Sequence, residues 1–112
     1  MSTAFITHPD CLLHDMGEWH PECPARLQAI DDQLIASGLH NYLMHVEAPL
    51  ASREHLERVH QANYIDAVEN QAPQSGLIHL DPDTAMCPHT LSAALRAAGA
   101  AVRATDMVIA GE

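Results

Sequence analysis

Chemically reactive side chains crowd one short loop near the start of the chain. Between His14 and Arg26 the loop holds two histidines, a cysteine and acidic residues. Imidazoles and carboxylates bind metals or move protons, and a guanidinium holds carboxylates in bidentate fashion. Pro21 and Pro24 stiffen the backbone, while Gly17 permits a turn that a residue with a Cβ would resist. A rigid loop carrying ionisable groups indicates a functional site.

One chemistry open to this loop is metal binding. Cys11, His14, His20 and Cys23 supply two thiols and two imidazoles, which is the ligand set of a structural zinc site. In small zinc modules, however, about a dozen residues usually separate a Cys pair from a His pair. In this sequence the two histidines lie between the two cysteines instead. A small non-enzymatic zinc-binding or interaction module therefore remains the alternative interpretation.

The order of several motifs indicates a different chemistry. Residues 20–27 read His-Pro-Glu-Cys-Pro-Ala-Arg-Leu and resemble the first loop of the histone-deacetylase-like zinc amidohydrolases, which include bacterial deacetylases and acetylpolyamine amidohydrolases. Segments 58–65, 80–84 and 87–100 resemble later parts of that family in the same order. The family's paired histidines, Asp-x-His zinc ligands and second zinc-binding aspartate all follow the matched region. The resemblance thus implies that residues 1–112 are the N-terminal fragment of a deacetylase domain, without its catalytic zinc-binding part.

This resemblance also implies a fold and an activity. The expected fold is the N-terminal part of an arginase–deacetylase-like, three-layer α/β/α architecture with a mostly parallel sheet. The full-length parent would use Zn²⁺ to hydrolyse N-acetyl amides, on acetyl-lysine or on acetylated amines such as polyamines. We expect the 112-residue chain alone to be inactive, with no catalytic residue and no metal ligand. A catalytically silent family relative is a third interpretation.

Two sets of site residues follow from the resemblance. An aspartate at the rim of the active site accepts hydrogen bonds from the substrate backbone, and this role transfers to Asp83, less readily to Asp81. Without the family, Asp-Pro-Asp-Thr would simply be good turn chemistry. Trp19 is expected to line the path of an alkyl substrate, although it could equally plug the core.

The second set lies at the inner end of the active-site tunnel. The family places an arginine there, beside an internal channel for acetate, and the motif transfers this role to Arg26. Glu22 is a candidate orienting partner, and His20 joins the same group. A guanidinium suits that position because it stays charged when buried and binds a carboxylate through two hydrogen bonds. The alternative is an ordinary surface arginine paired with Glu22.

Alternating elements must position these loops. A short β-branched segment at 3–7 predicts a first strand, and Pro24 opens an amphipathic helix over 24–37 that ends before Gly38. Residues 42–47 predict a second strand. A strand–helix–strand order normally pairs the two strands in parallel.

The second half of the chain is predicted to be mainly helical. We expect helices over 52–59 and 62–70, then an apolar run at 77–80 that enters the turn at 81–84. A long alanine-rich helix should follow over 88–110, and its predicted inner face consists of Leu91, Leu95, Ala98, Val102 and Ile109. So few strands leave sheet edges and apolar stripes open, which predicts self-association of the fragment.

Composition excludes some classes of partner. The chain has 5 arginines, no lysine and a formal net charge of −10, so it lacks the cationic cluster that nucleic-acid binding requires. Three cysteines and a start without a signal-peptide pattern indicate the cytoplasm. No apolar run approaches the roughly 20 residues needed to cross a bilayer, so no membrane partner is expected.

Overall fold

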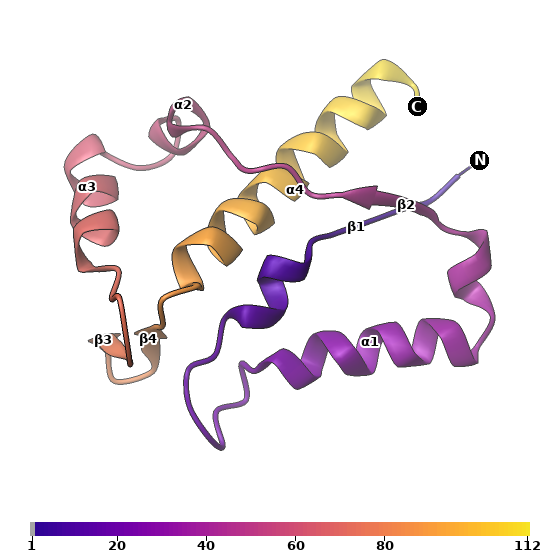
Figure 1. Cartoon of the computed structure of the whole chain (residues 1–112). Helices are drawn as coiled ribbons and strands as arrows, with labels where there is room; N and C mark the ends of the chain where they lie inside the picture. The colour runs from indigo at the N-terminus through magenta and orange to yellow at the C-terminus, as the bar shows by residue number, and fades with distance from the viewer. Residues whose placement is uncertain (1) are drawn as a thin grey trace.

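The protein has a mixed α/β fold. The computed structural model describes residues 2–112, and Figure 1 shows the order of the elements along the chain. The elements are β1 (Ala4–Thr7), η1 (Pro9–Leu13), α1 (Pro24–Ala36), η2 (Leu39–Tyr42), β2 (Met44–Glu47), α2 (Arg53–Glu57), α3 (Ala62–Gln71), β3 (Ile78–Asp81), β4 (Thr84–Met86) and α4 (Thr90–Ala110).

The first half of the chain forms the predicted strand–helix–strand unit. Strands β1 and β2 pair in parallel, with Ile6 opposite Val46. Helix α1 begins at Pro24, whose fixed φ suits the first helical position, and it is followed by Gly38 in the left-handed conformation at φ 81°. The 3₁₀ turns η1 and η2 were not predicted, because each is only one short turn without its own hydrophobic period.

Helices α2 and α3 confirm the helices predicted for the middle of the chain. Ser52 caps α2 through a capping box, in which its hydroxyl accepts the N–H of His55 and the His55 ring accepts the N–H of Ser52. Arg53 then joins α2 to α3 with ion pairs to Glu57 at 2.9 Å and Asp66 at 2.8 Å. Hydrogen bonds to these two carboxylates raise the pKa of the Arg53 guanidinium.

The β3–β4 hairpin is a feature that the sequence did not predict. Its strands pair antiparallel, with Ile78 opposite Met86 and a register irregularity between His79 and Asp81. The predicted apolar run forms β3, and the predicted turn forms the tip of the hairpin. Strand β4 has only three residues and its polar and apolar positions do not alternate clearly, so periodicity alone could not identify it.

Helix α4 packs against η1 and β1 along a face that differs from the predicted one. Ile109 was expected to face inward, but it is 80% exposed, and that prediction is wrong. The buried residues of α4 are Ala93, Gly99 and Met107. The prediction followed the larger apolar side chains, whereas close packing of backbones selects small residues for the contact itself. Leu91, Leu95, Ala98 and Val102 lie half-buried beside that face.

A close backbone contact fixes where α4 crosses the end of β2. A Cβ built on Gly99 would lie 1.8 Å from the carbonyl oxygen of Pro49, so only glycine fits there. The N–H of Ala51 donates to the carbonyl oxygen of Leu95 at 3.0 Å. Arg96 adds hydrogen bonds to the carbonyl of Ala48 and to Asp10 at 3.0 and 3.1 Å.

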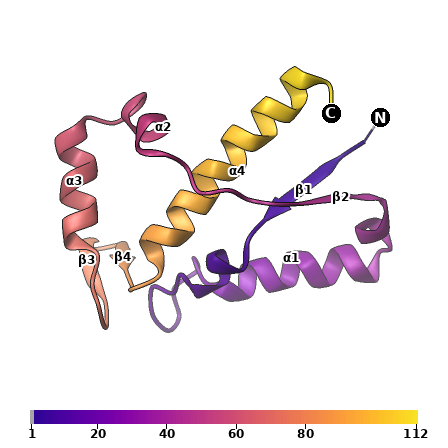
Figure 2. The ribbon, with the colours of Figure 1, turned by 45° about the horizontal axis from the view of Figure 1, so that its top comes forward.

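The hydrophobic core of the described chain is thin. Its buried residues are mostly small: Ala48, Ala51, Ile65, Ala85, Met86, Cys87, Ala93 and Met107. The radius of gyration is 15.7 Å, whereas a compact domain of this length has about 13 Å. The β1–β2 pair runs between α4 and α1 (Figure 2). Within residues 2–112 no helix combines the length and hydropathy that a membrane span requires.

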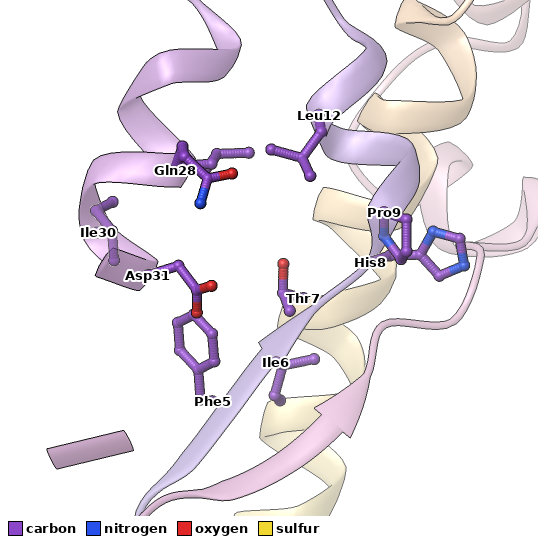
Figure 3. A pocket seen from close by; sticks show the side chains of 10 residues that line it. Phe5, Ile6, Thr7, His8, Pro9, Leu12, Gln28, Ile30 and Asp31 are labelled. Carbon is purple, nitrogen blue, oxygen red and sulfur yellow. The ribbon is translucent and has the colours of Figure 1, made fainter. Parts of the chain in front are cut away.

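Helix α1 leaves a gap against the first strand. A pocket of about 280 Å³ lies between β1, η1 and α1, and most of its lining atoms belong to apolar side chains. Figure 3 shows Leu12 of η1 and Gln28 of α1 on opposite sides of this pocket, with Ile6 and Thr7 at the strand. The gap makes the packing of the core weaker still, because the atoms that line an unfilled apolar space lose packing contacts.

Candidate functional site

The tip of the β3–β4 hairpin presents two aspartates with different tasks. The carboxylate of Asp81 accepts the backbone N–H of Asp83 at 2.8 Å, which is the hydrogen bond of an Asx turn. The Asp83 side chain is 92% exposed. Turn formation therefore falls to Asp81, and the carboxylate of Asp83 is free to take other partners.

One of those partners comes from the first loop. The Nε2 atom of His20 lies 3.0 Å from the carbonyl oxygen of Asp83 and 3.2 Å from its Oδ1 atom, across a separation of 63 residues. The Nδ1 atom of the same ring accepts the backbone N–H of Glu22 at 3.0 Å. A neutral ring that accepts at Nδ1 carries its proton on Nε2, so His20 donates to Asp83. The sequence had grouped His20 with the inner channel, whereas the structure places it against the predicted rim residue.

Arg26 and Glu22 form an ion pair at the start of α1. The Arg26 Nη2 atom lies 3.1 Å from Glu22 Oε2, one helical turn away, and both side chains are about half exposed. The sequence proposed Glu22 as the orienting partner of Arg26, and the structure shows this contact. Because Glu22 also donates its N–H to His20, the predicted channel residues form one continuous chain of contacts that reaches Asp83.

Trp19 is not part of this series of polar contacts. Its side chain is 97% exposed, so the interpretation of Trp19 as a plug over the core is wrong. Its φ is 68°, in the left-handed region that a bulky residue rarely adopts. This unusual backbone lies directly beside His20, whose ring is held by two partners.

The two histidines of the alternative zinc module turn toward different partners. The Nδ1 atom of His14 lies 2.7 Å from the hydroxyl of Thr90, while His20 faces Asp83. Within residues 2–112 no three His, Cys, Asp or Glu side chains come close enough to hold a metal ion. The described structure therefore does not assemble this module.

A second cluster, missed by the sequence interpretation, anchors the base of the first loop. The Thr90 hydroxyl accepts the N–H of Cys87 at 2.8 Å and bonds to His14, and the Cys87 thiol lies 3.4 Å from the carbonyl of Leu13. Burial raises the pKa of Cys87, but hydrogen bonds from Thr90 and nearby backbone groups outweigh it, and the net pKa is lowered. The available signal in the sequence was Thr90, because a threonine hydroxyl can bond to backbone groups a few residues away.

Together these contacts join the first loop to the hairpin tip at one candidate site. A loop that follows a parallel strand meets a hairpin tip, and their junction is rich in carboxylates and holds one guanidinium. The histone deacetylase domain family matches residues 20–112. The chain therefore belongs to the histone deacetylase family.

Relatives of known name agree with this assignment. The chain is 34% identical to the polyamine deacetylase HDAC10 of Mus musculus, 32% to a probable deacetylase of Archaeoglobus fulgidus, and 32% to the histone deacetylase-like amidohydrolase of Pseudomonas aeruginosa. These alignments cover 99%, 97% and 98% of the chain. The chain spans only 18%, 30% and 33% of those proteins.

A solved structure confirms the predicted fold class. The chain matches the HD domain of HDA15 with a TM-score of 0.87 and 26% sequence identity. The match covers 98% of this chain and 32% of that chain. The described elements therefore have the same arrangement as part of a deacetylase domain.

Proposed function

We propose that these residues supply substrate-facing loops of a zinc-dependent deacetylase that hydrolyses N-acetyl amides. The substrate would be acetyl-lysine or an acetylated amine, such as an acetylated polyamine. Family membership supports the reaction class, and the names of the relatives include a polyamine deacetylase and an amidohydrolase. In this proposal residues 1–112 are the N-terminal part of the catalytic domain.

The observation that carries this proposal is the state of Asp83. Its carboxylate stands exposed at a hairpin tip, its backbone is held by Asp81, and a histidine of another loop donates to it. An exposed carboxylate that is held in place suits the rim role, in which it accepts N–H groups of an acetylated substrate. Trp19, which precedes His20 in the sequence, offers an exposed apolar surface for the alkyl chain of that substrate.

Arg26 takes the product-facing role in this proposal. Its guanidinium would hold acetate at the inner end of the active site, oriented by the ion pair with Glu22. In this proposal the zinc ligands of the enzyme are those that the family resemblance places after the matched region. The cytoplasmic location that the sequence indicated remains a prediction.

The rim role is tested by Asp83→Ala in the complete deacetylase that carries these residues. Loss of a hydrogen bond to a charged acceptor costs about 1.5–3 kcal/mol, so kcat/KM for an acetyl-lysine peptide or acetylated polyamine should fall roughly ten- to a hundredfold. Zinc content and Tm should stay near those of the unchanged protein. The matched control is Asp32→Ala, because Asp32 is an exposed aspartate that bonds only locally to Gln28. A collapsed Tm with normal kcat/KM would give Asp83 a structural role at the hairpin tip in place of the rim role.

A further inference from the structure

The contact between His20 and Asp83 has a use beyond joining two loops. We propose that His20 is a positioning residue, which fixes the carboxylate of Asp83 in the orientation that substrate requires. This inference rests on the proposed rim role of Asp83. It assigns to His20 the task of determining how tightly an acetylated substrate binds, without contact between His20 and the reacting atoms.

The side chains of His20 and Asp83 differ greatly in conformational freedom. The His20 side chain is 20% exposed, and its Nδ1 atom is held by the N–H of Glu22. Pro21 follows directly and restricts the backbone of the loop. Asp83, in contrast, is 92% exposed. An anchored donor thus meets an acceptor that would otherwise rotate freely in water.

The geometry of the contact leaves room for substrate. His20 Nε2 lies within hydrogen-bond distance of both the carbonyl oxygen and the Oδ1 atom of Asp83, so it restrains the backbone and the side chain together. A carboxylate has about four acceptor positions on two oxygens. One donor from His20 therefore leaves Oδ2 and part of Oδ1 available for the N–H groups of a substrate.

If His20 orders the Asp83 carboxylate before substrate binds, loss of His20 should change mainly KM. Substrate that meets a mobile Asp83 must pay the entropy of fixing it, and immobilising one side chain changes binding by about two- to tenfold. Steps after binding do not involve His20, so kcat should change less. A purely structural clamp between the first loop and the hairpin would instead lower Tm and affect all kinetic parameters.

The experiment compares three variants of the complete deacetylase. His20→Phe keeps a planar ring without a donor and should raise KM about two- to tenfold, whereas His20→Gln keeps an N–H donor and should restore most of the affinity. His79→Phe is the matched control, because His79 is an exposed histidine of the same hairpin. Its KM should equal that of the unchanged protein. Equal KM values for the His20→Phe and His20→Gln variants would overturn the proposal.

A double-mutant cycle separates positioning from general loop stability. If His20 acts through Asp83, then His20→Phe should have no further effect on KM once Asp83→Ala is present. Additive effects would show that His20 does not act through Asp83. If Asp83→Ala alone leaves KM and kcat unchanged, the rim role itself fails.

A measurement without catalysis distinguishes these two failures. In ¹⁵N NMR spectra of the complete protein, the His20 ring should show a protonated Nε2 whose signal shifts in Asp83→Ala and not in Asp32→Ala. A shifted signal together with unchanged kinetics would mean that the contact exists but the proposed function is wrong. Because the Asp83 carbonyl oxygen remains in Asp83→Ala, an unshifted signal would show that His20 does not bond to the carboxylate, and it would refute the positioning role of His20.

Discussion

At the scale of single residues, the site is one connected chain of polar contacts. Arg26 pairs with Glu22, the Glu22 backbone holds the ring of His20, and that ring donates to Asp83. Asp81 completes the chain by fixing the hairpin turn. The proposed product-binding and substrate-binding ends are thus linked through three consecutive contacts. A substitution at one end is therefore expected to alter the geometry of the other end.

Arg26 provides a prediction at this scale. In the complete deacetylase, Arg26→Met should lower kcat roughly ten- to a hundredfold, because it removes a charged hydrogen-bond donor toward acetate. Zinc content should stay intact, because a protonated guanidinium has no acceptor that could bind a metal ion. The matched control is Arg58→Met, because Arg58 forms a similar pair with Glu54 one turn away. Turnover that resembles the Arg58→Met variant would reduce Arg26 to a surface residue.

The candidate residues of this site could be named from the sequence, but the contact that joins the two loops could not. Motif order identified Asp83, Arg26 and Glu22, and local spacing predicted the Arg26–Glu22 contact. The His20–Asp83 contact joins positions 63 residues apart, and no local rule of spacing links them. Which aspartate makes the turn was also beyond the sequence, because Asp81 and Asp83 both suit turn chemistry.

At the scale of elements, α4 is the support that the two loops share. Its N-terminal residue Thr90 bonds to His14 at the base of the first loop, and Cys87 connects it to β4. Farther along, Arg96 holds Asp10 of η1 and the carbonyl of Ala48. The position of α4 therefore determines how the first loop and the hairpin approach one another.

The close contact at Gly99 provides a prediction at this scale. Gly99→Ala should lower the free energy of unfolding of the complete protein by about 1–3 kcal/mol, because its Cβ would collide with the Pro49 carbonyl. Helix propensity alone predicts the opposite sign, a gain of about 1 kcal/mol. Ala97→Gly at an exposed position of α4 is the control and should lose only that amount. Chemical denaturation measures both, and a more stable Gly99→Ala variant would exclude the clash.

Elements with a long hydrophobic period were predictable, and those defined by tertiary contacts were not. Helices α1, α3 and α4 and the parallel β1–β2 pair follow from period, proline and glycine. The three-residue strand β4 exists because β3 lies beside it. The inner face of α4 was misjudged at Ile109, since backbone contact at Gly99 requires the smallest residue and not the most apolar one.

At the scale of the whole molecule, the described chain is open and buries few residues. Its few buried residues are mostly small, and its radius of gyration of 15.7 Å exceeds the value of about 13 Å for compact domains of this length. Strands β1 and β2 form a sheet of only two strands, each with one open edge in the described residues. Parallel strands are normally buried on both faces within larger sheets. These features fit a part of a larger deacetylase domain.

Open apolar surface extends over several elements. The most exposed large side chains include Val108 and Ile109 at the end of α4, Tyr42 in η2 and Val59 after α2, each at least 79% exposed. Such surface, together with unpaired strand edges, favours association. A second copy would pair its strand edge with this one or exchange a helix, and exchange of an element is a low-cost route to dimers.

The most direct test is light scattering of the isolated 112-residue chain over a series of concentrations, combined with chemical unfolding. If these residues are a part of a larger domain, the average mass should rise above that of a monomer with concentration, and unfolding should be broad at low concentration. A monomer at every concentration that unfolds in one cooperative transition would contradict the account, because it would show that the 112 residues form a domain of their own.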